Sequence, residues 1–280
     1  MPTQVSRWHT KPKRSLGQKF LIDENIARNI IRDMRLSEND VVVEIGPGRG
    51  ALTKYLAPKV HHLVAVEIDG WLVKDLRSRF GSANVSVLHE DFLDLDLSGV
   101  QRQCGRRLRL VGNIPYHLTS GILIKAFDQH TALKDFTLMV QREVAQRLVA
   151  PHGTKQYGIL SVYARFYGTL KSLFTVSPNC FYPKPKVSSA VIHEHMYEDI
   201  PYDVDEQLFR TTVRTAFGKR RKTLRNALKY LPLETRIVDV LTRSRSAILD
   251  KRPEQLTVEQ FVDLTNRITE TIHAASLAES

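Results

Sequence analysis

Between Leu16 and about Met196, short apolar runs alternate with stretches of helical periodicity. The apolar runs are rich in Val, Ile and Leu and are bounded by Gly, Asp or Asn, which predicts buried strands at 41–45, 62–67, 85–88, 108–111 and 136–140. The stretches between them predict helices at 24–34, 51–56, 70–80, 119–130 and 142–149. This alternation predicts an α/β fold with a mostly parallel sheet, helices on both of its faces, and ligands at the carboxyl ends of its strands.

The pattern changes after Met196. Residues 197–201 resemble a linker, and residues 205–275 show helical spacing with little strand signal. We therefore predict two domains, an α/β domain at 1–198 and a small all-helical domain at 199–280. In the second domain, a common apolar face is expected for Leu208, Val213, Phe217, Leu224 and Leu228.

The composition is globular, with 42% hydrophobic and 25% charged residues, but 41 Lys and Arg against 30 Asp and Glu give a net charge of +11. A positive field favours polyanions, nucleic acid first and anionic membrane second. The basic residues gather in three acid-free segments, at 1–22, at 207–233 and around 102–109. The first holds Arg7, Lys11, Lys13, Arg14 and Lys19, and the last holds Arg102, Arg106, Arg107 and Arg109. We expect RNA contacts at Arg220, Arg221, Lys222, Arg225, Arg106 and Arg107, the alternative being that these are ordinary solvated surfaces.

The cysteines and histidines do not suggest a metal site. Cys104 and Cys180 form no CxxC pair, which argues against a zinc site or a disulfide scaffold and fits a reducing compartment. The histidines at 61–62 and at 193 and 195 are not spaced with other ligands. No signal peptide and no apolar run of roughly 18 residues is present, so we expect a cytoplasmic protein without membrane contact.

Residues 41–50 have the sequence VVVEIGPGRG, a strand followed by a glycine-rich turn. Gly46 and Gly48 allow the backbone to approach a nucleotide-like ligand closely. The spacing is GxGxG rather than the GxGxxG of pyrophosphate-binding folds. Glu44 would repel a pyrophosphate but suits a cofactor with a cationic amino group and a sulfonium. The alternative is an NAD-binding or purely structural unit of the same shape.

Acidic residues follow the next strands in the same way. Glu67 ends the strand at 62–67, where a carboxylate can accept hydrogen bonds from both hydroxyls of a ribose. Asp91 follows the next strand and can accept a hydrogen bond from an adenine amine. The neighbouring Ile68 and Phe92 are counted with them as candidate cofactor contacts.

The segment Asn113-Ile114-Pro115-Tyr116 follows the fourth predicted strand and suggests methylation of an amine on a base. The lone pair of adenine N6 is delocalised into the ring, so the amine is a poor nucleophile. Acceptance of its hydrogens by the Asn113 side chain and the Ile114 carbonyl would localise that lone pair. Pro115 fixes the turn and Tyr116 can stack on a flipped-out base. A simple capping turn is the alternative.

A second aromatic side chain, Phe181, lies in the proline-stiffened segment FYPKPKV at 181–187. We expect it to face Tyr116 across the base, the alternative being a buried side chain in a connecting loop.

These motifs resemble those of the bacterial KsgA (RsmA) family of small-subunit rRNA adenine dimethyltransferases. The likeness runs nearly from end to end, through SLGQKFL at 15–21, VEIGPGRGALT at 43–53, VEID at 66–69, GNIPY at 112–116, QREVAQRL at 141–148, YGILS at 157–161, FYPKPKV at 181–187, RRKTLRN at 220–226 and LDKRPEQL at 249–256.

The resemblance implies a Rossmann-like class I methyltransferase domain followed by a small helical domain. It implies dimethylation of N6 on two adjacent adenosines in a hairpin loop near the 3′ end of 16S rRNA, with S-adenosyl-L-methionine as cofactor. The partner implied is 16S rRNA within the immature small ribosomal subunit, and we expect a monomer.

The resemblance also implies cofactor contacts at Lys19, Leu21, Gly46, Glu67, Asp91 and Asn113, to which we add Glu44, Gly48, Ile68 and Phe92. The position of Lys19 usually holds Asn or His in this family. A lysine side chain next to a sulfonium is electrostatically unfavourable, so contact through its backbone, or a side chain turned toward RNA, is expected.

Three other functions compete with this one. The related Erm group methylates 23S rRNA and shares the glycine loop, NIPY and FxPxPxV, but QREVAQRL and RRKTLRN favour the small-subunit family. A non-catalytic RNA-binding assembly factor is disfavoured by the intact turn at 113–116. An NAD oxidoreductase is disfavoured by GxGxG and by the basic segments.

Overall fold

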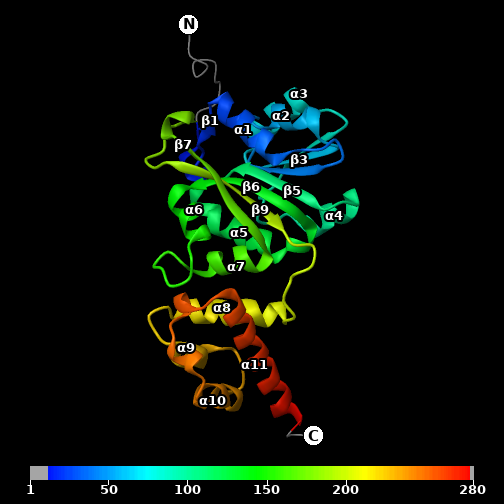
Figure 1. Ribbon diagram of the computed structural model, residues 1–280. Coiled ribbons are helices and arrows are strands. Elements are labelled where there is room, and N and C mark those ends of the chain that lie inside the picture. Colours follow the sequence, from blue (N-terminus) through cyan, green and yellow to red (C-terminus); the bar gives the residue numbers. More distant parts are fainter. Residues whose placement is uncertain (1–11, 278–280) are drawn as a thin grey trace. The chain divides into compact units, whose positions relative to one another are not determined.

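The computed structural model describes residues 12–277 (Figure 1). The chain divides into two compact units. The first, called here the sheet unit, comprises the described residues up to Ala145 together with Leu170–Met196. The second, the helical unit, comprises Gln146–Thr169 and the described residues from Tyr197 onward.

A seven-stranded sheet forms the centre of the sheet unit, with strand order β4-β3-β2-β5-β6-β9-β7. Its strands are β2 (Val41–Ile45), β3 (His62–Glu67), β4 (Val85–His89), β5 (Leu108–Asn113), β6 (Leu133–Gln141), β7 (Gly168–Val176) and β9 (Ser189–Met196). The pairs from β4 to β6 are parallel, and β9 runs antiparallel to β6. The carboxyl ends of β2, β3 and β5 therefore meet at one edge of the sheet.

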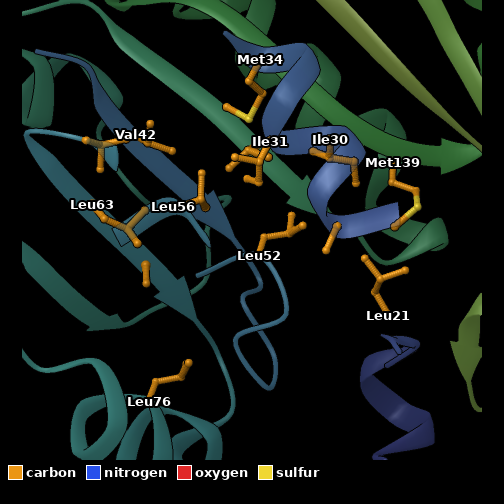
Figure 2. Close-up of a cluster of buried hydrophobic side chains, with 14 of the residues drawn as sticks. Leu21, Ile30, Ile31, Met34, Val42, Leu52, Leu56, Leu63, Leu76 and Met139 are labelled. Carbon is orange, nitrogen blue, oxygen red and sulfur yellow. The ribbon is translucent and has the colours of Figure 1, made fainter. Parts of the chain in front are cut away.

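Helices cover the sheet on both faces. They are α1 (Glu24–Met34), α2 (Thr53–Leu56), α3 (Gly70–Phe80), α4 (Leu97–Cys104) and α5 (Thr119–Asp128), while α6 (Arg142–Val149) begins in the sheet unit and ends in the helical unit. One face packs Ile30, Ile31 and Met34 of α1 and Leu76 of α3 into a buried cluster with strand residues such as Val42 (Figure 2). On the other face, Phe127 of α5 meets Phe136 of β6 edge to face, with ring centroids 6.0 Å apart. Neighbouring side chains of a strand point to opposite faces, so the central strands, buried on both faces, are mostly apolar, with Glu44 in β2 and Arg109 in β5 as buried exceptions.

A short antiparallel ladder lies beside the main sheet. It pairs β1 (Phe20–Leu21) with β8 (Phe181–Tyr182), so that Leu21 is opposite Phe181. The ladder ties the segment before α1 to the connection between β7 and β9. It also fixes which side chains of these two segments enter the core.

The helical unit contains α7 (Ile159–Tyr167), α8 (Glu206–Gly218), α9 (Leu224–Ala227), α10 (Thr235–Arg243) and α11 (Val258–Leu277). Its core is aromatic, since the ring of Phe166 in α7 stacks on Phe209 in α8 with centroids 3.9 Å apart. This packing explains why Gln146–Thr169 groups with the C-terminal helices. The predicted boundary at residue 198 assigned that segment to the first domain, because the boundary rested on the change of pattern after Met196 alone.

No helix within residues 12–277 combines the length and the apolarity that crossing a bilayer requires.

Candidate active site

A cleft opens at the edge of the sheet where β2, β3 and β5 end. It is lined by every residue predicted to contact a cofactor: Lys19, Leu21, Glu44, Gly46, Gly48, Glu67, Ile68, Asp91, Phe92 and Asn113. The predicted catalytic residues Ile114, Pro115 and Tyr116 line the same cleft. The topology thus gathers residues from five separate segments of the chain around one cavity.

The glycine-rich turn forms one wall of the cleft. Gly46 and Gly48 both have φ of 58°, in the left-handed region that side chains disfavour. A Cβ atom on Gly48 would lie 3.0 Å from Cδ1 of Phe20, whereas one on Gly46 would meet no atom within 4 Å. Gly48 is therefore required by packing as well as by backbone conformation. Gly46 is required by conformation, and its open side leaves room for a ligand.

Two acidic side chains are buried at this wall. Glu67 accepts hydrogen bonds from the backbone N–H of Gly48 and of Asp69, both at 3.0 Å. Glu44 accepts one from the hydroxyl of Thr53 at 2.6 Å. Burial raises the pKa of Glu67, and burial together with the charge of Glu67 raises the pKa of Glu44 to about 8. The free cleft thus holds acids that a cationic ligand would stabilise in their ionised form.

The opposite side of the cofactor cleft offers contacts for a flat ring. Ile68 is 47% exposed, an unusual value for an isoleucine that follows a buried strand. Asp91 accepts a hydrogen bond from the backbone N–H of Leu93 at 2.9 Å through one carboxylate oxygen. An adenine could therefore pack against Ile68 while its amine donates to the other oxygen of Asp91.

The turn at 113–116 begins at the last residue of β5. The side-chain nitrogen Nδ2 of Asn113 donates to the backbone carbonyl of Lys19 at 2.6 Å, which orients the amide and leaves Oδ1 as its acceptor. Pro115 has φ of −59°, and its carbonyl accepts from the N–H of Leu118 at 3.0 Å. The Tyr116 hydroxyl is 2.8 Å from Oγ of Ser189, so the ring is held at its far end.

The role of Lys19 was only partly predictable. Its backbone carbonyl contributes to the site by accepting from Asn113, while the expected contact of its backbone with the cofactor stays a prediction. The segment that carries it is also held at Asp69, which is 2.8 Å from Nζ of Lys13 and 3.2 Å from Nε2 of Gln18. These contacts depend on residues 50 or more positions apart, and no sequence motif marked them.

The structure does not bring Phe181 to Tyr116. Phe181 is 3% exposed, belongs to the hydrophobic core of the sheet unit and does not line the cleft. The cause is the pairing of β1 with β8, which sets Phe181 opposite Leu21 and turns both side chains into the core. The expectation that its ring faces the base is therefore corrected in favour of the buried alternative.

The basic residues fall into two groups. Arg221 and Arg106 are exposed, as expected of residues that contact RNA. Others bind the protein itself: Arg220 donates to the carbonyl of Lys155 at 2.6 Å, Arg225 lies 3.0 Å from Asp250, and Arg107 donates to the carbonyl of Leu133 at 2.9 Å. Lys222 is exposed and lies 3.2 Å from the hydroxyl of Tyr230.

Arg109 does not belong to a basic surface. It is 4% exposed and pairs with Asp40 at 2.7 Å and with Asp135 at 2.8 Å. Its grouping with Arg106 and Arg107 is therefore corrected, because aspartates far away in the sequence neutralise it. Arg7 and Lys11 of the first basic segment lie outside the described residues.

Within the part of the chain that the structure describes, no three or more His, Cys, Asp and Glu side chains are placed to hold a metal ion. Two of the histidines considered above contact side chains of neighbouring strands. His62 is 3.0 Å from Oγ of Ser86, and His193 is 2.9 Å from Oγ1 of Thr137.

Comparison with known proteins agrees with this arrangement. A family model described as ribosomal RNA adenine dimethylase matches residues 9–270. The ribosomal RNA small subunit methyltransferase A of Alkaliphilus oremlandii is 39% identical over 274 residues, which are 96% of each chain. The protein of the same name from Chlorobium phaeobacteroides is 44% identical over 252 residues, 90% of this chain and 92% of the relative.

Solved structures support the fold. A dimethyladenosine transferase from Plasmodium falciparum aligns with a TM-score of 0.74 and 22% identity, covering 90% of this chain and 98% of its own. The 23S rRNA methyltransferase ErmE aligns with a TM-score of 0.62 and 24% identity, covering 88% and 99%. The fold class predicted from the sequence is confirmed. From the family match along most of its length and its identity with these relatives, the chain belongs to the ribosomal RNA adenine dimethylase family.

Proposed function

We propose that this chain dimethylates N6 of two adjacent adenosines in a hairpin loop near the 3′ end of 16S rRNA, with S-adenosyl-L-methionine as the methyl donor. We propose further that it acts as a monomer in the cytoplasm on the immature small ribosomal subunit. One observation carries the proposal: the turn at 113–116 and the glycine-rich turn line the same cleft. A base and a methyl donor would meet there.

The cleft residues fit this cofactor. S-adenosyl-L-methionine, when bound, supplies an electrophilic methyl group on a sulfonium. Glu67 would accept from the ribose hydroxyls, and Asp91 from the adenine amine; both line the cleft. Glu44, buried beside the glycine turn, offers negative charge to the cationic end. Lys19 lines the cleft, and its carbonyl accepts from Asn113.

The turn at 113–116 would activate the target amine. Oδ1 of Asn113 and the carbonyl of Ile114 accept its two hydrogens, and the nitrogen lone pair then points away from them. Tyr116, tied to Ser189, offers its ring to the base. Bound S-adenosyl-L-methionine would supply the methyl group to N6 and keep the electron pair of the broken carbon–sulfur bond, and the methylated nitrogen would lose its extra proton to water. Because each donor molecule supplies one methyl group, the second methylation would take a second molecule of the donor.

Catalysis by this site rests on placement and polar preorganisation rather than on a strong base. The methylated nitrogen becomes acidic only after the bond has formed, so no early deprotonation is needed. Holding the base nitrogen in line with the methyl group makes a reaction between two molecules effectively unimolecular. The hydrogen bond from Asn113 to Lys19 fixes the amide before the base arrives, which is the sense in which the site is preorganised.

The small subunit is favoured over 23S rRNA by the relatives. Those cited above are small-subunit methyltransferases with 39% and 44% identity. ErmE, at 24% identity, supports the fold alone.

The test is a tritiated-methyl assay on three substrates: immature small subunits, mature small subunits and protein-free 23S rRNA. Labelled nucleosides are then identified after digestion. We expect N6,N6-dimethyladenosine from immature subunits only. Label in 23S rRNA would favour an Erm-type activity. Binding to the subunit without any label would identify a non-catalytic assembly factor.

A further inference from the structure

Tyr230 is an exposed aromatic residue surrounded by lysines in the helical unit. Its side chain is 52% exposed, at the end of a short 3-10 helix (Leu228–Tyr230). Nζ of Lys219 lies 4.2 Å from the centre of its ring, and Nζ of Lys222 lies 5.1 Å from it. The segment from 207 to 233 that holds all of them contains no acidic residue.

The two lysines occupy different parts of the ring. Lys222 is 3.2 Å from the hydroxyl oxygen, so it lies at the hydroxyl edge. Lys219 lies over the ring at cation–π distance and covers one face. Half of the side chain is nevertheless exposed, so part of the ring is accessible to a partner in solution.

The surroundings are positive. The hydrogen bond from Lys222 and the charges of Lys222, Lys219 and Lys229 hold the pKa of the Tyr230 phenol below its usual value. The nearby arginines contribute less to an outside partner, because Arg220 and Arg225 already bind carbonyls and carboxylates of this unit. The lysines clustered around Tyr230, together with the exposed Arg221, are thus cations that a ligand can reach.

An exposed aromatic ring among lysines suits one class of partner. A base stacks on an aromatic ring without regard to its identity, while nearby cations contact the phosphates. A purely apolar protein surface would gain nothing from the lysines, and a phosphate alone would gain nothing from the ring. RNA with an unpaired nucleotide satisfies both parts.

We propose that Tyr230 is a stacking platform for an unpaired nucleobase of the rRNA substrate, with Lys219, Lys222 and Lys229 contacting the adjoining phosphates. This rests on the proposed function, since it takes the rRNA as the partner. It adds a base contact in the helical unit to a region whose predicted role was backbone contact only.

The test compares Tyr230→Ala with Tyr230→Phe, since phenylalanine keeps the ring and loses the hydroxyl. Val240→Ala is the matched control, because Val240 is 62% exposed in the same unit, on α10. The measurement is the Kd for immature small subunits by filter binding over a series of salt concentrations. Thermal unfolding of each variant shows whether the fold is intact.

We expect Tyr230→Ala to raise Kd by roughly five- to 150-fold without changing the salt slope, because no charge is lost. Tyr230→Phe and Val240→Ala should stay within about twofold of the unmodified protein. Equal losses for Ala and Phe would overturn the proposal, since the hydroxyl contact with Lys222 would then be what matters. So would an unchanged Kd for Tyr230→Ala.

The unmodified protein separates the two proposals. If it methylates immature subunits while Tyr230→Ala binds them normally, only the platform is wrong. If it neither binds nor methylates them, the proposed function itself fails.

Discussion

Glu44 links cofactor binding to a proton, which gives a quantitative test of the cleft. Burial and the neighbouring charge of Glu67 raise the pKa of Glu44 to about 8, despite the hydrogen bond from Thr53. At pH 7 about nine-tenths of the free protein therefore carries a proton on Glu44. A cationic ligand in the cleft favours the carboxylate and expels that proton.

The number of protons released and the pH dependence of the affinity follow from the raised pKa of Glu44. If the cation restores the ordinary pKa of 4.5, binding at pH 7 releases about 0.9 proton. Affinity then rises by up to about tenfold per pH unit between 4.5 and 8, since one pKa unit is worth about 1.4 kcal/mol. The stability of the free protein depends on pH in the opposite direction to the affinity for the ligand. Below pH 4.5 Glu44 is protonated in the folded and the unfolded chain alike, so its burial does not lower the free energy of unfolding. As the pH rises from 4.5 through about 8, the carboxyl ionises more readily in the unfolded chain, and the free energy of unfolding falls.

The assay is calorimetric titration with S-adenosyl-L-methionine at pH 7 in two buffers that differ in ionisation enthalpy. The difference in observed heat gives the number of protons released. Glu44→Gln is the matched variant, because an amide keeps an acceptor for Thr53 but cannot ionise. Proton release should be largely lost in it, any remainder belonging to Glu67. Buffer-independent heats in the unmodified protein, or equal release by both proteins, would refute the reasoning.

Three further predictions concern single contacts. Glu67→Ala should raise the KM for S-adenosyl-L-methionine, and an unaltered KM would remove this residue from the ribose site. Replacing Arg221 and Lys222 together by Gln should reduce the salt slope of RNA binding by up to about two, and an unchanged slope would place both residues off the RNA. Arg109→Met should lower the free energy of unfolding at neutral pH by about 3–5 kcal/mol in urea titrations, because two buried aspartates lose the guanidinium that pairs with both, and Asp40 keeps the more distant Lys134 at 3.4 Å. A loss below about 1 kcal/mol would show that water reaches them.

The sequence predicted the parallel part of the sheet well. The runs at 41–45 and 62–67 coincide with β2 and β3, because a strand buried on both faces has apolar residues at most of its positions. The last two strands of the main sheet in the strand order, β9 and β7, were missed. β9 (Ser189–Met196) carries His193, Glu194 and His195, and β7 is exposed or half-buried along most of its length, so neither has that pattern.

The cleft was predicted from motifs at the ends of strands, where topology alone brings residues together. What the motifs could not give is the partner of each side chain. Phe181 and Arg109 have the right residue types for base and RNA contacts, yet β-pairing buries the first and two aspartates neutralise the second. The hydrogen bond from Asn113 to Lys19 joins residues 94 positions apart. Its acceptor is a backbone carbonyl, which every residue type has, so the sequence does not indicate it.

The most direct test of this account is the single-turnover rate of methyl transfer by Asn113→Ala at saturating cofactor and RNA. Ser189→Ala, which frees the Tyr116 hydroxyl but leaves Asn113 in place, is the control. If Asn113 grips the adenine amine, its loss should slow transfer on the order of 10²–10³-fold while the Kd for RNA stays nearly unchanged. A rate within a few-fold of the unmodified protein would contradict the central role given to this turn.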